Sequence, residues 1–196
     1  DKIGVIKSNM IIPQVVENYS NNTNSNIARL EYCPVCNGVT RIKQTDNSIS
    51  LYCANDSCPS KLLCQLKHFC SRDALNIEGL SEATLKKFVA LGFIKQIADI
   101  FSLHIHKDRI RLLEGFGDKS VFQLLDNIEK SKQTQLPNFI YALGIEGVGL
   151  STAKVLSQHF NHNFEELLAA DINALESIDG VGKITASSID DYFTEK

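Results

Sequence analysis

The chain has no apolar run that approaches the roughly 18 residues a membrane-spanning helix needs, and it has no excess of positive charge. Lys and Arg number 20 against 23 Asp and Glu, so the formal net charge is −3. The first absence excludes a transmembrane protein, and we expect a soluble protein with no membrane partner. The second means that any nucleic-acid binding must rest on backbone dipoles and a few placed cations. The charge is also uneven, because residues 163–196 carry 2 basic and 8 acidic side chains.

A catalytic motif is also missing. The five histidines stand in no spacing typical of a metal site or a general base, and no nucleophile motif accompanies them. We therefore expect each histidine to be a surface or core residue. Since the chain begins at Asp1 without an initiator Met, it looks like a piece of a longer protein, and the lack of a signal peptide says little about its location.

A short glycine-centred pattern occurs four times, at residues 77–81, 113–117, 145–149 and 178–182. Each copy has an apolar residue, an acid, Gly and a second apolar residue, and three copies end in another Gly. The central glycines are 36, 32 and 33 residues apart. Such a period indicates a repeated supersecondary unit, and the paired glycines permit a very tight connection between two helices. We interpret the unit as a helix-hairpin-helix motif.

Such hairpins suit phosphate binding, because the N-terminus of a helix offers unpaired N–H groups and a partial positive charge. One copy alone could be a simple helix end, but four spaced copies argue against coincidence. In the first copy Ser81 replaces the second Gly, so we expect Gly79 to be structural. The sequence predicts that DNA phosphates are held at Gly115, Gly117, Lys119, Gly147, Gly149, Gly180, Gly182 and Lys183.

Four cysteines have the spacing of a structural zinc site: Cys33, Cys36, Cys53 and Cys58. The β-branched and apolar residues between the two pairs predict a two-stranded hairpin that brings them together. With four Cys ligands no open coordination position remains, so we expect structural Zn²⁺ and no catalytic metal. Two disulfides in a secreted domain are the alternative, although the cysteine usage favours a reducing interior. We expect Cys64 and Cys70 to be buried helical thiols.

The sequence thus predicts a mainly α protein with a small zinc finger. Residues 1–16 read as strands left over from a larger domain, and 17–28 as a polar linker. The zinc finger occupies 29–60. Residues 61–196 form a helical domain with four helix-hairpin-helix motifs, in which apolar stripes at helical spacing face the core.

This order of parts resembles the C-terminal half of bacterial NAD-dependent DNA ligases, and the resemblance covers essentially the whole chain. Residues 11–15 are similar to the end of that family's OB-fold domain, and the four-cysteine segment is similar to its zinc finger. Further similar stretches lie at 68–80, 115–120 and 141–145.

The resemblance implies a parent enzyme that seals nicks in duplex DNA during replication and repair, in the bacterial cytoplasm. NAD and Mg²⁺ would serve an N-terminal part outside this chain. The partners would be nicked double-stranded DNA and the parent's nucleotidyltransferase and OB-fold domains. The family's adenylated lysine sits in a Lys-x-Asp-Gly motif, whereas the only Asp-Gly here, Asp179-Gly180, has Ser177 at the lysine position. The chain alone is therefore expected not to ligate, and no BRCT domain is recognisable.

Two other classes of function stay open. Helix-hairpin-helix pairs also occur in non-catalytic DNA-repair scaffolds. The acidic stretch at 163–196 is compatible with a protein-interaction module instead.

Overall fold

The computed structural model describes residues 2–8, 12–20, 29–45 and 48–194. The chain divides into two compact units, Asp1–Ala54 and Asn55–Lys196, and each is described by itself. Among the described residues, no helix has both the length and the apolar character that crossing a bilayer requires. The described residues are mainly helical, which confirms the predicted fold class.

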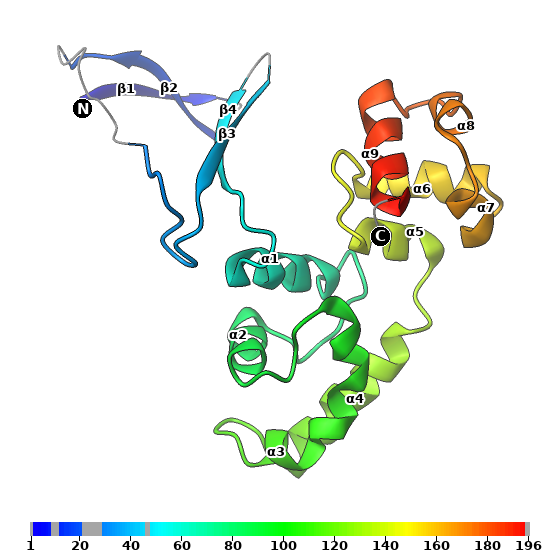
Figure 1. The fold of residues 1–196 in the computed structure, drawn as a ribbon. Helices are drawn as coiled ribbons and strands as arrows, with labels where there is room; N and C mark the ends of the chain where they lie inside the picture. Colours follow the sequence, from blue (N-terminus) through cyan, green and yellow to red (C-terminus); the bar gives the residue numbers. More distant parts are fainter. Residues whose placement is uncertain (1, 9–11, 21–28, 46–47, 195–196) are drawn as a thin grey trace. The chain divides into compact units, whose positions relative to one another are not determined.

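Two antiparallel ribbons make up the first unit (Figure 1). In one, β1 (Ile3–Ser8) pairs with β2 (Ile12–Asn18), and in the other, β3 (Thr40–Thr45) pairs with β4 (Ser48–Cys53). The described apolar side chains of β1 and β2 are all about half exposed, so this ribbon buries no core of its own.

The predicted boundaries of the first unit are only partly described. Strands lie where residues 1–16 predicted them, and β2 continues to Asn18, two residues into the segment predicted as a linker. Residues 21–28 of that linker lie outside the described residues. The β3–β4 hairpin occupies the predicted place between the two cysteine pairs.

Helices follow throughout the second unit. In chain order they are α1 (Pro59–Phe69), α2 (Glu82–Ala90), the 3₁₀ helix η1 (Ile97–His106), α3 (Lys107–Arg111), α4 (Asp118–Ser131), α5 (Leu136–Ala142), α6 (Leu150–His159), α7 (Phe164–Leu168), α8 (Ile172–Glu176) and α9 (Lys183–Thr194). Side-chain caps explain several of the starts, because Ser81, Asn163 and Asp171 each accept a hydrogen bond from an amide in the first turn that follows.

The four glycine-centred segments all join two helices, and we name them hairpin 1 (77–81), hairpin 2 (113–117), hairpin 3 (145–149) and hairpin 4 (178–182). They fall into two pairs, each with its own apolar core. Hairpins 1 and 2 contribute to a core formed by α1 to α4 with η1, and hairpins 3 and 4 to a core formed mainly by α5 to α9 (Figure 1). Neighbouring motifs along the chain are thus partners in space.

One backbone geometry recurs in the hairpins. The central glycines have φ between +81° and +97°, a region that side chains disfavour. The amide of the apolar residue that follows donates to the carbonyl of the apolar residue before it, as in Val148 to Ile145 at 3.0 Å and Val181 to Ile178 at 3.0 Å. Both apolar residues of hairpins 1, 3 and 4 are buried, so they form part of the core beneath the turn.

The second glycines differ from the central ones. Gly117 has φ −157° and Gly149 has φ −83°, both extended, and Gly182 is also outside the positive-φ region. Ser81 in hairpin 1 has a similar extended conformation, with φ −63° and ψ 163°. Any residue can adopt this backbone, so the fold does not require glycine there.

Hairpin 1 leads into a helix whose first residue is held by two lysines. Glu82 accepts from Lys67 on α1 at 2.6 Å and from Lys86 on α2 at 2.8 Å. Both ammonium groups favour the ionised carboxylate and lower the pKa of Glu82 to about 2. The first turn of α2 therefore carries its own negative charge.

The two glycines of hairpin 3 should respond differently to the same substitution. We expect Gly147→Ala to lower the free energy of unfolding by about 1–3 kcal/mol, because an alanine is strained at positive φ. Its Cβ would also lie 3.2 Å from Thr185 Oγ1. Gly149→Ala should change it by at most about 0.5 kcal/mol, because nothing lies within 4 Å of the added Cβ. Urea unfolding followed by circular dichroism measures both, and equal losses would contradict these assignments.

The ion pairs at Glu82 predict a titration. Because the folded pKa is about 2 and the ordinary value is 4.5, the stabilisation is complete above pH 4.5 and is lost as pH falls toward 2. We expect the side-chain carboxyl ¹³C resonance of Glu82 to titrate near pH 2, and Lys67→Gln to move the midpoint up. A midpoint near 4.5 in the unsubstituted protein would show that the pairs do not persist in solution.

Candidate metal centre and nucleic-acid interface

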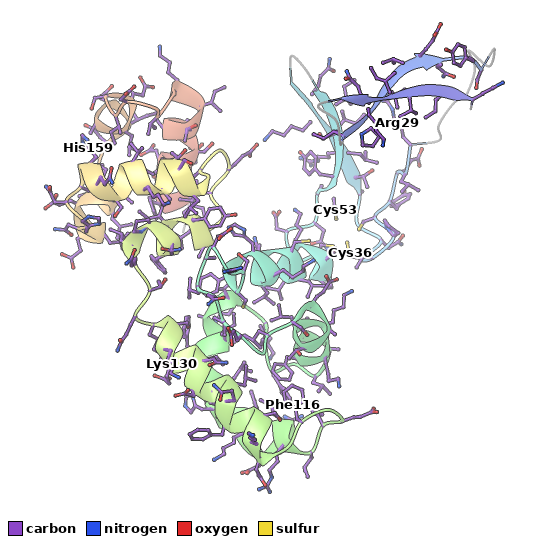
Figure 2. All side chains as sticks on the ribbon, turned by 180° about the vertical axis from the view of Figure 1, so that it is seen from behind. Arg29, Cys36, Cys53, Phe116, Lys130 and His159 are labelled. Atoms are coloured by element: carbon purple, nitrogen blue, oxygen red, sulfur yellow. The ribbon has the colours of Figure 1, made fainter. Side chains whose placement is uncertain are left out.

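The four predicted metal ligands lie together. The Sγ atoms of Cys33, Cys36, Cys53 and Cys58 are all within 4.8 Å of one another. Cys36 and Cys53, whose Sγ atoms are 3.4 Å apart, are seen close together in Figure 2. A tetrahedral site with metal–sulfur bonds of about 2.3 Å separates its sulfurs by about 3.8 Å. The four side chains therefore fit a single metal ion.

Local backbone structure explains how the first pair is presented. Residues 33–38 form a tight turn, in which the Asn37 amide donates to the Cys33 carbonyl at 2.9 Å and the Cys33 amide to the Gly38 carbonyl at 2.8 Å. Asn37 has φ 55°, a conformation that Asn tolerates better than most residues. The Gly38 amide also lies 3.4 Å from Cys36 Sγ. The turn thus points backbone donors at a sulfur.

Backbone donors also favour the thiolate that a metal needs. Hydrogen bonds from the amides of Cys36 and Val35 lower the pKa of the Cys33 thiol. Cys33 and Cys58 are buried, whereas Cys36 and Cys53 are partly exposed. The turn at Cys33 and Cys36 matches a knuckle beside a metal ion, in which amides bond to the ligating sulfurs.

The other cysteines do not join this group. All six cysteines lie among the described residues and none is in a disulfide, which opposes the two-disulfide alternative. Cys70 is buried at the end of α1, and burial raises the pKa of its thiol to about 12. The prediction that Cys64 is buried was wrong: it is exposed. It lies off the stripe of α1 that buries Leu66 and Phe69.

The predicted phosphate-binding glycines have open surroundings. A Cβ added at Gly115, Gly117, Gly149, Gly180 or Gly182 would meet no atom within 4 Å. Gly147 is the exception, because Thr185 lies against it. The second glycine of hairpins 2, 3 and 4 is therefore required neither by backbone conformation nor by packing. What remains is a stretch of uncovered backbone at the start of α4, α6 and α9.

Those helix starts offer donors. The first N–H groups of a helix lack intrahelical partners, and no side chain caps α4 or α6 in the way that Ser81 caps α2. In hairpin 2 the Ser120 hydroxyl accepts a hydrogen bond from the Gly117 amide at 2.8 Å. The amides that follow in the first turn of α4 have no side-chain cap. Lys119 and Lys183 are exposed in the first turns of α4 and α9. A cation is unfavourable at a helix N-terminus unless an anion is near, and in α4 the neighbouring Asp118 already supplies one negative charge.

Hairpin 1 is built differently. Its Ser81 hydroxyl accepts from the Thr84 amide at 3.3 Å, and Glu82 supplies a negative charge in the first turn. The Glu82 carboxylate is taken up by Lys67 and Lys86, so the Ser81 cap is what sets this helix start apart. The prediction that Gly79 has a structural part agrees with its surroundings, since an added Cβ would lie 3.1 Å from Leu124.

Two side-chain hydrogen bonds that the sequence did not indicate connect hairpins 1 and 2. Lys87 Nζ donates to the Glu114 carbonyl at 3.0 Å, and Asn127 Nδ2 donates to the Glu78 carbonyl at 3.1 Å. Each side chain extends from the helix of one hairpin to the loop of the other. Figure 2 marks this region at Phe116, in the loop between α3 and α4. No sequence pattern reveals such contacts, because they depend on how the motifs pair.

The histidines are structural where contacts define them. His68 Nε2 lies 2.6 Å from the Tyr141 carbonyl and so donates to it, which links α1 to the end of α5. Ser157 Oγ and His162 Nδ1 are 2.7 Å apart, a pairing that resembles a nucleophile with its base. Ser157, however, has no exposed surface. A substrate cannot reach it, so the pair is a helix-end contact.

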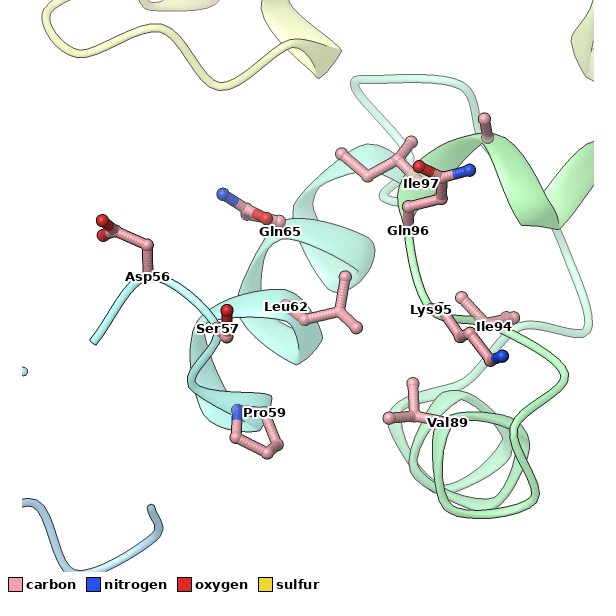
Figure 3. A pocket seen from close by; sticks show the side chains of 11 residues that line it. Asp56, Ser57, Pro59, Leu62, Gln65, Val89, Ile94, Lys95, Gln96 and Ile97 are labelled. Atoms are coloured by element: carbon pink, nitrogen blue, oxygen red, sulfur yellow. The ribbon is translucent and has the colours of Figure 1, made fainter. Parts of the chain in front are cut away.

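A cavity of about 690 Å³ lies between α1, α2 and the segment leading into η1 (Figure 3). Its wall is largely aliphatic, with Leu62, Val89 and Ile94 facing each other and Lys95 at the side. Among its lining residues there is no Cys or His. It offers neither a metal donor set nor an imidazole base.

Comparison with known proteins finds a matching family profile and similar, longer proteins. A family profile described as helix-hairpin-helix motif matches residues 138–196, which include hairpins 3 and 4. Proteins named DNA ligase are similar over nearly the whole chain. Those of Lachnoclostridium phytofermentans and Ruminiclostridium cellulolyticum are both 44% identical to it over 98% and 100% of its length, and that of Fusobacterium nucleatum is 36% identical over 100%.

These relatives are much longer than the chain, which spans only 28–30% of their lengths. A four-cysteine group and a helix-hairpin-helix region accompany the similarity. The chain is therefore a homologue of bacterial DNA ligases, and its parts fit a C-terminal segment of such a protein.

Proposed function

We propose that this chain is the part of a nick-sealing, NAD-dependent DNA ligase that holds duplex DNA by its backbone. Hairpins 2, 3 and 4 bind phosphates through the amides that begin α4, α6 and α9, aided by Lys119 and Lys183. Phosphate contacts of this kind fix position without reading sequence, which suits an enzyme that must act at any nick in replication and repair. The DNA ligase relatives support this assignment.

The observation that carries the proposal is the open second glycine of hairpins 2, 3 and 4. Gly117, Gly149 and Gly182 occupy positions where neither conformation nor packing requires glycine. Close approach of a ligand to the backbone does require it. The same position in hairpin 1 holds a serine, whose hydroxyl already caps the start of α2. We therefore assign no DNA contact to hairpin 1.

Two acids of the C-terminal region lie well away from the start of α9. Asp190 and Asp191 stand seven and eight residues beyond Lys183 on α9, about 10–12 Å along the helix. That distance exceeds the screening length of about 8 Å at physiological salt. The acids at the far end of α9 therefore act weakly on a phosphate at its start.

We infer that the four cysteines hold one structural Zn²⁺, since a set of four thiolates suits this ion and leaves no position open for a substrate. The ion would fix the two knuckles and the β3–β4 hairpin between them. Adenylate transfer, with NAD and Mg²⁺, is assigned to parts of the ligase outside this chain, because Ser177 stands where a Lys-x-Asp-Gly motif would need lysine. The DNA, those further domains and a bacterial cytoplasmic location complete the proposal.

The metal assignment predicts coupled folding. We expect the purified chain to bind one Zn²⁺, and Cys33→Ser or chelation to unfold residues 29–58 while the helices of the second unit persist, because so short a segment cannot order itself by apolar burial. Metal analysis and backbone NMR shifts measure this. Cys64→Ser is the matched control and should keep one equivalent of metal. Unchanged shifts around β3 and β4 after metal removal would contradict the assignment.

The DNA assignment is tested with one side chain at two equivalent positions. We expect Gly149→Thr to weaken binding to nicked duplex about tenfold or more, because the side chain covers the amides that bond the phosphate. Thr remains a good N-cap, so helix stability should hold. Ser81→Thr is the matched control and should leave affinity unchanged. Fluorescence anisotropy over a salt series measures both.

A charge variant supplies the second readout. Lys183→Gln should reduce the slope of log Kd against log salt by about one unit, since one phosphate contact is lost. If neither Gly149→Thr nor Lys183→Gln altered binding, or if wild-type binding were insensitive to salt, a protein partner would replace DNA as the better assignment.

A further inference from the structure

Large apolar side chains flank hairpins 2 and 4 on the outside. Among the described residues, four such side chains are more than two-thirds exposed: Leu112, Ile184, Ile105 and Phe122. Leu112 immediately precedes hairpin 2 and is 81% exposed. Ile184 follows hairpin 4 as the second residue of α9 and is 83% exposed. Single exposed apolar residues are ordinary, but the two most exposed ones both lie beside predicted phosphate sites.

The fold does not use these two side chains. Hairpin 4 already buries Ile178 and Val181 in the second core, and hairpin 2 packs Leu113 and Phe116 against the first. Ile184 does not belong to the buried face of α9, which carries Ala186 and Ile189. Replacing Leu112 or Ile184 with a small polar residue would therefore remove no core contact.

Their neighbours indicate what could cover them. Ile184 lies next to Lys183 and the open backbone of Gly182 in the sequence, and Leu112 and Lys119 stand on the two sides of the hairpin 2 loop. A ligand fitting both parts must present an anion and an apolar surface a few ångströms apart. The backbone of DNA does so, because each phosphate is bonded to a deoxyribose, and the C–H groups of that sugar form an apolar surface.

We propose that Leu112 and Ile184 pack against the deoxyriboses adjoining the phosphates held by hairpins 2 and 4. This inference rests on the proposed function. Leu112 precedes its loop and Ile184 follows its own, and hairpin 3 has Gly144 and Ser151 at these two positions, so it has neither apolar side chain. Hairpin 3 holds its phosphate through amides alone, whereas hairpins 2 and 4 add an apolar contact.

The two kinds of contact have different salt dependence. A phosphate contact releases counterions, so it weakens as salt rises. Burial of an aliphatic side chain on a sugar releases none, and its contribution follows the apolar area removed from water. Loss of the sugar contact should therefore shift affinity by the same factor at every salt concentration, with no change of slope.

The experiment compares Leu112→Ser and Ile184→Ser in the zinc-loaded chain with Ile105→Ser, a control that is 71% exposed in η1 and adjoins no hairpin loop. Gly182→Thr is measured in parallel as a probe of the phosphate site itself. Duplex DNA is titrated by anisotropy at several salt concentrations. Thermal melting confirms that each variant is folded.

We expect Leu112→Ser and Ile184→Ser each to weaken binding about fivefold with an unchanged salt slope, and Ile105→Ser to bind like the wild type. If Gly182→Thr weakens binding but Ile184→Ser does not, the sugar contact is refuted and the phosphate site stands. An equal loss for Ile105→Ser would also refute it. If Gly182→Thr and Gly149→Thr both bind normally, the proposed function itself fails.

Discussion

The second unit depends on one backbone turn that contains a glycine at positive φ. In this turn the carbonyl of the apolar residue before the glycine accepts a hydrogen bond from the amide of the apolar residue after it. This turn reverses the chain in a few residues and packs both apolar side chains against a core, and in hairpins 1, 3 and 4 both are buried. The start of the following helix is thereby directed outward. Core formation and presentation of the amides are therefore both consequences of the same turn.

The sequence predicted these turns because their chemistry is local. A central glycine, two flanking apolar residues and a helix start are all within about five positions. The cysteine group was predictable for a similar reason, since each pair of ligands comes from one short turn and the strands between them show clear patterning. Of the glycines predicted to contact DNA, all but Gly147 have open surroundings.

Other features could not be read from the sequence. Helical periodicity tells which face of a helix is buried but not which helix covers it. The pairing of hairpin 1 with hairpin 2 through Lys87 and Asn127 therefore had no signal. The same limit explains the error at Cys64, because one residue's place on a short helix depends on the covering neighbours. Net charge was also a poor guide, since opposite charges sit at the two ends of α9.

The pairing of adjacent motifs also bears on how the chain reaches its folded state. Each core is made from one continuous stretch, roughly the first or the second half of the helical unit, and few core residues are shared across the boundary near α5. Contacts close in sequence cost little loop-closure entropy and form quickly. The first hairpin pair can thus condense while the second is still emerging from the ribosome, and His68 then joins the two through the Tyr141 carbonyl.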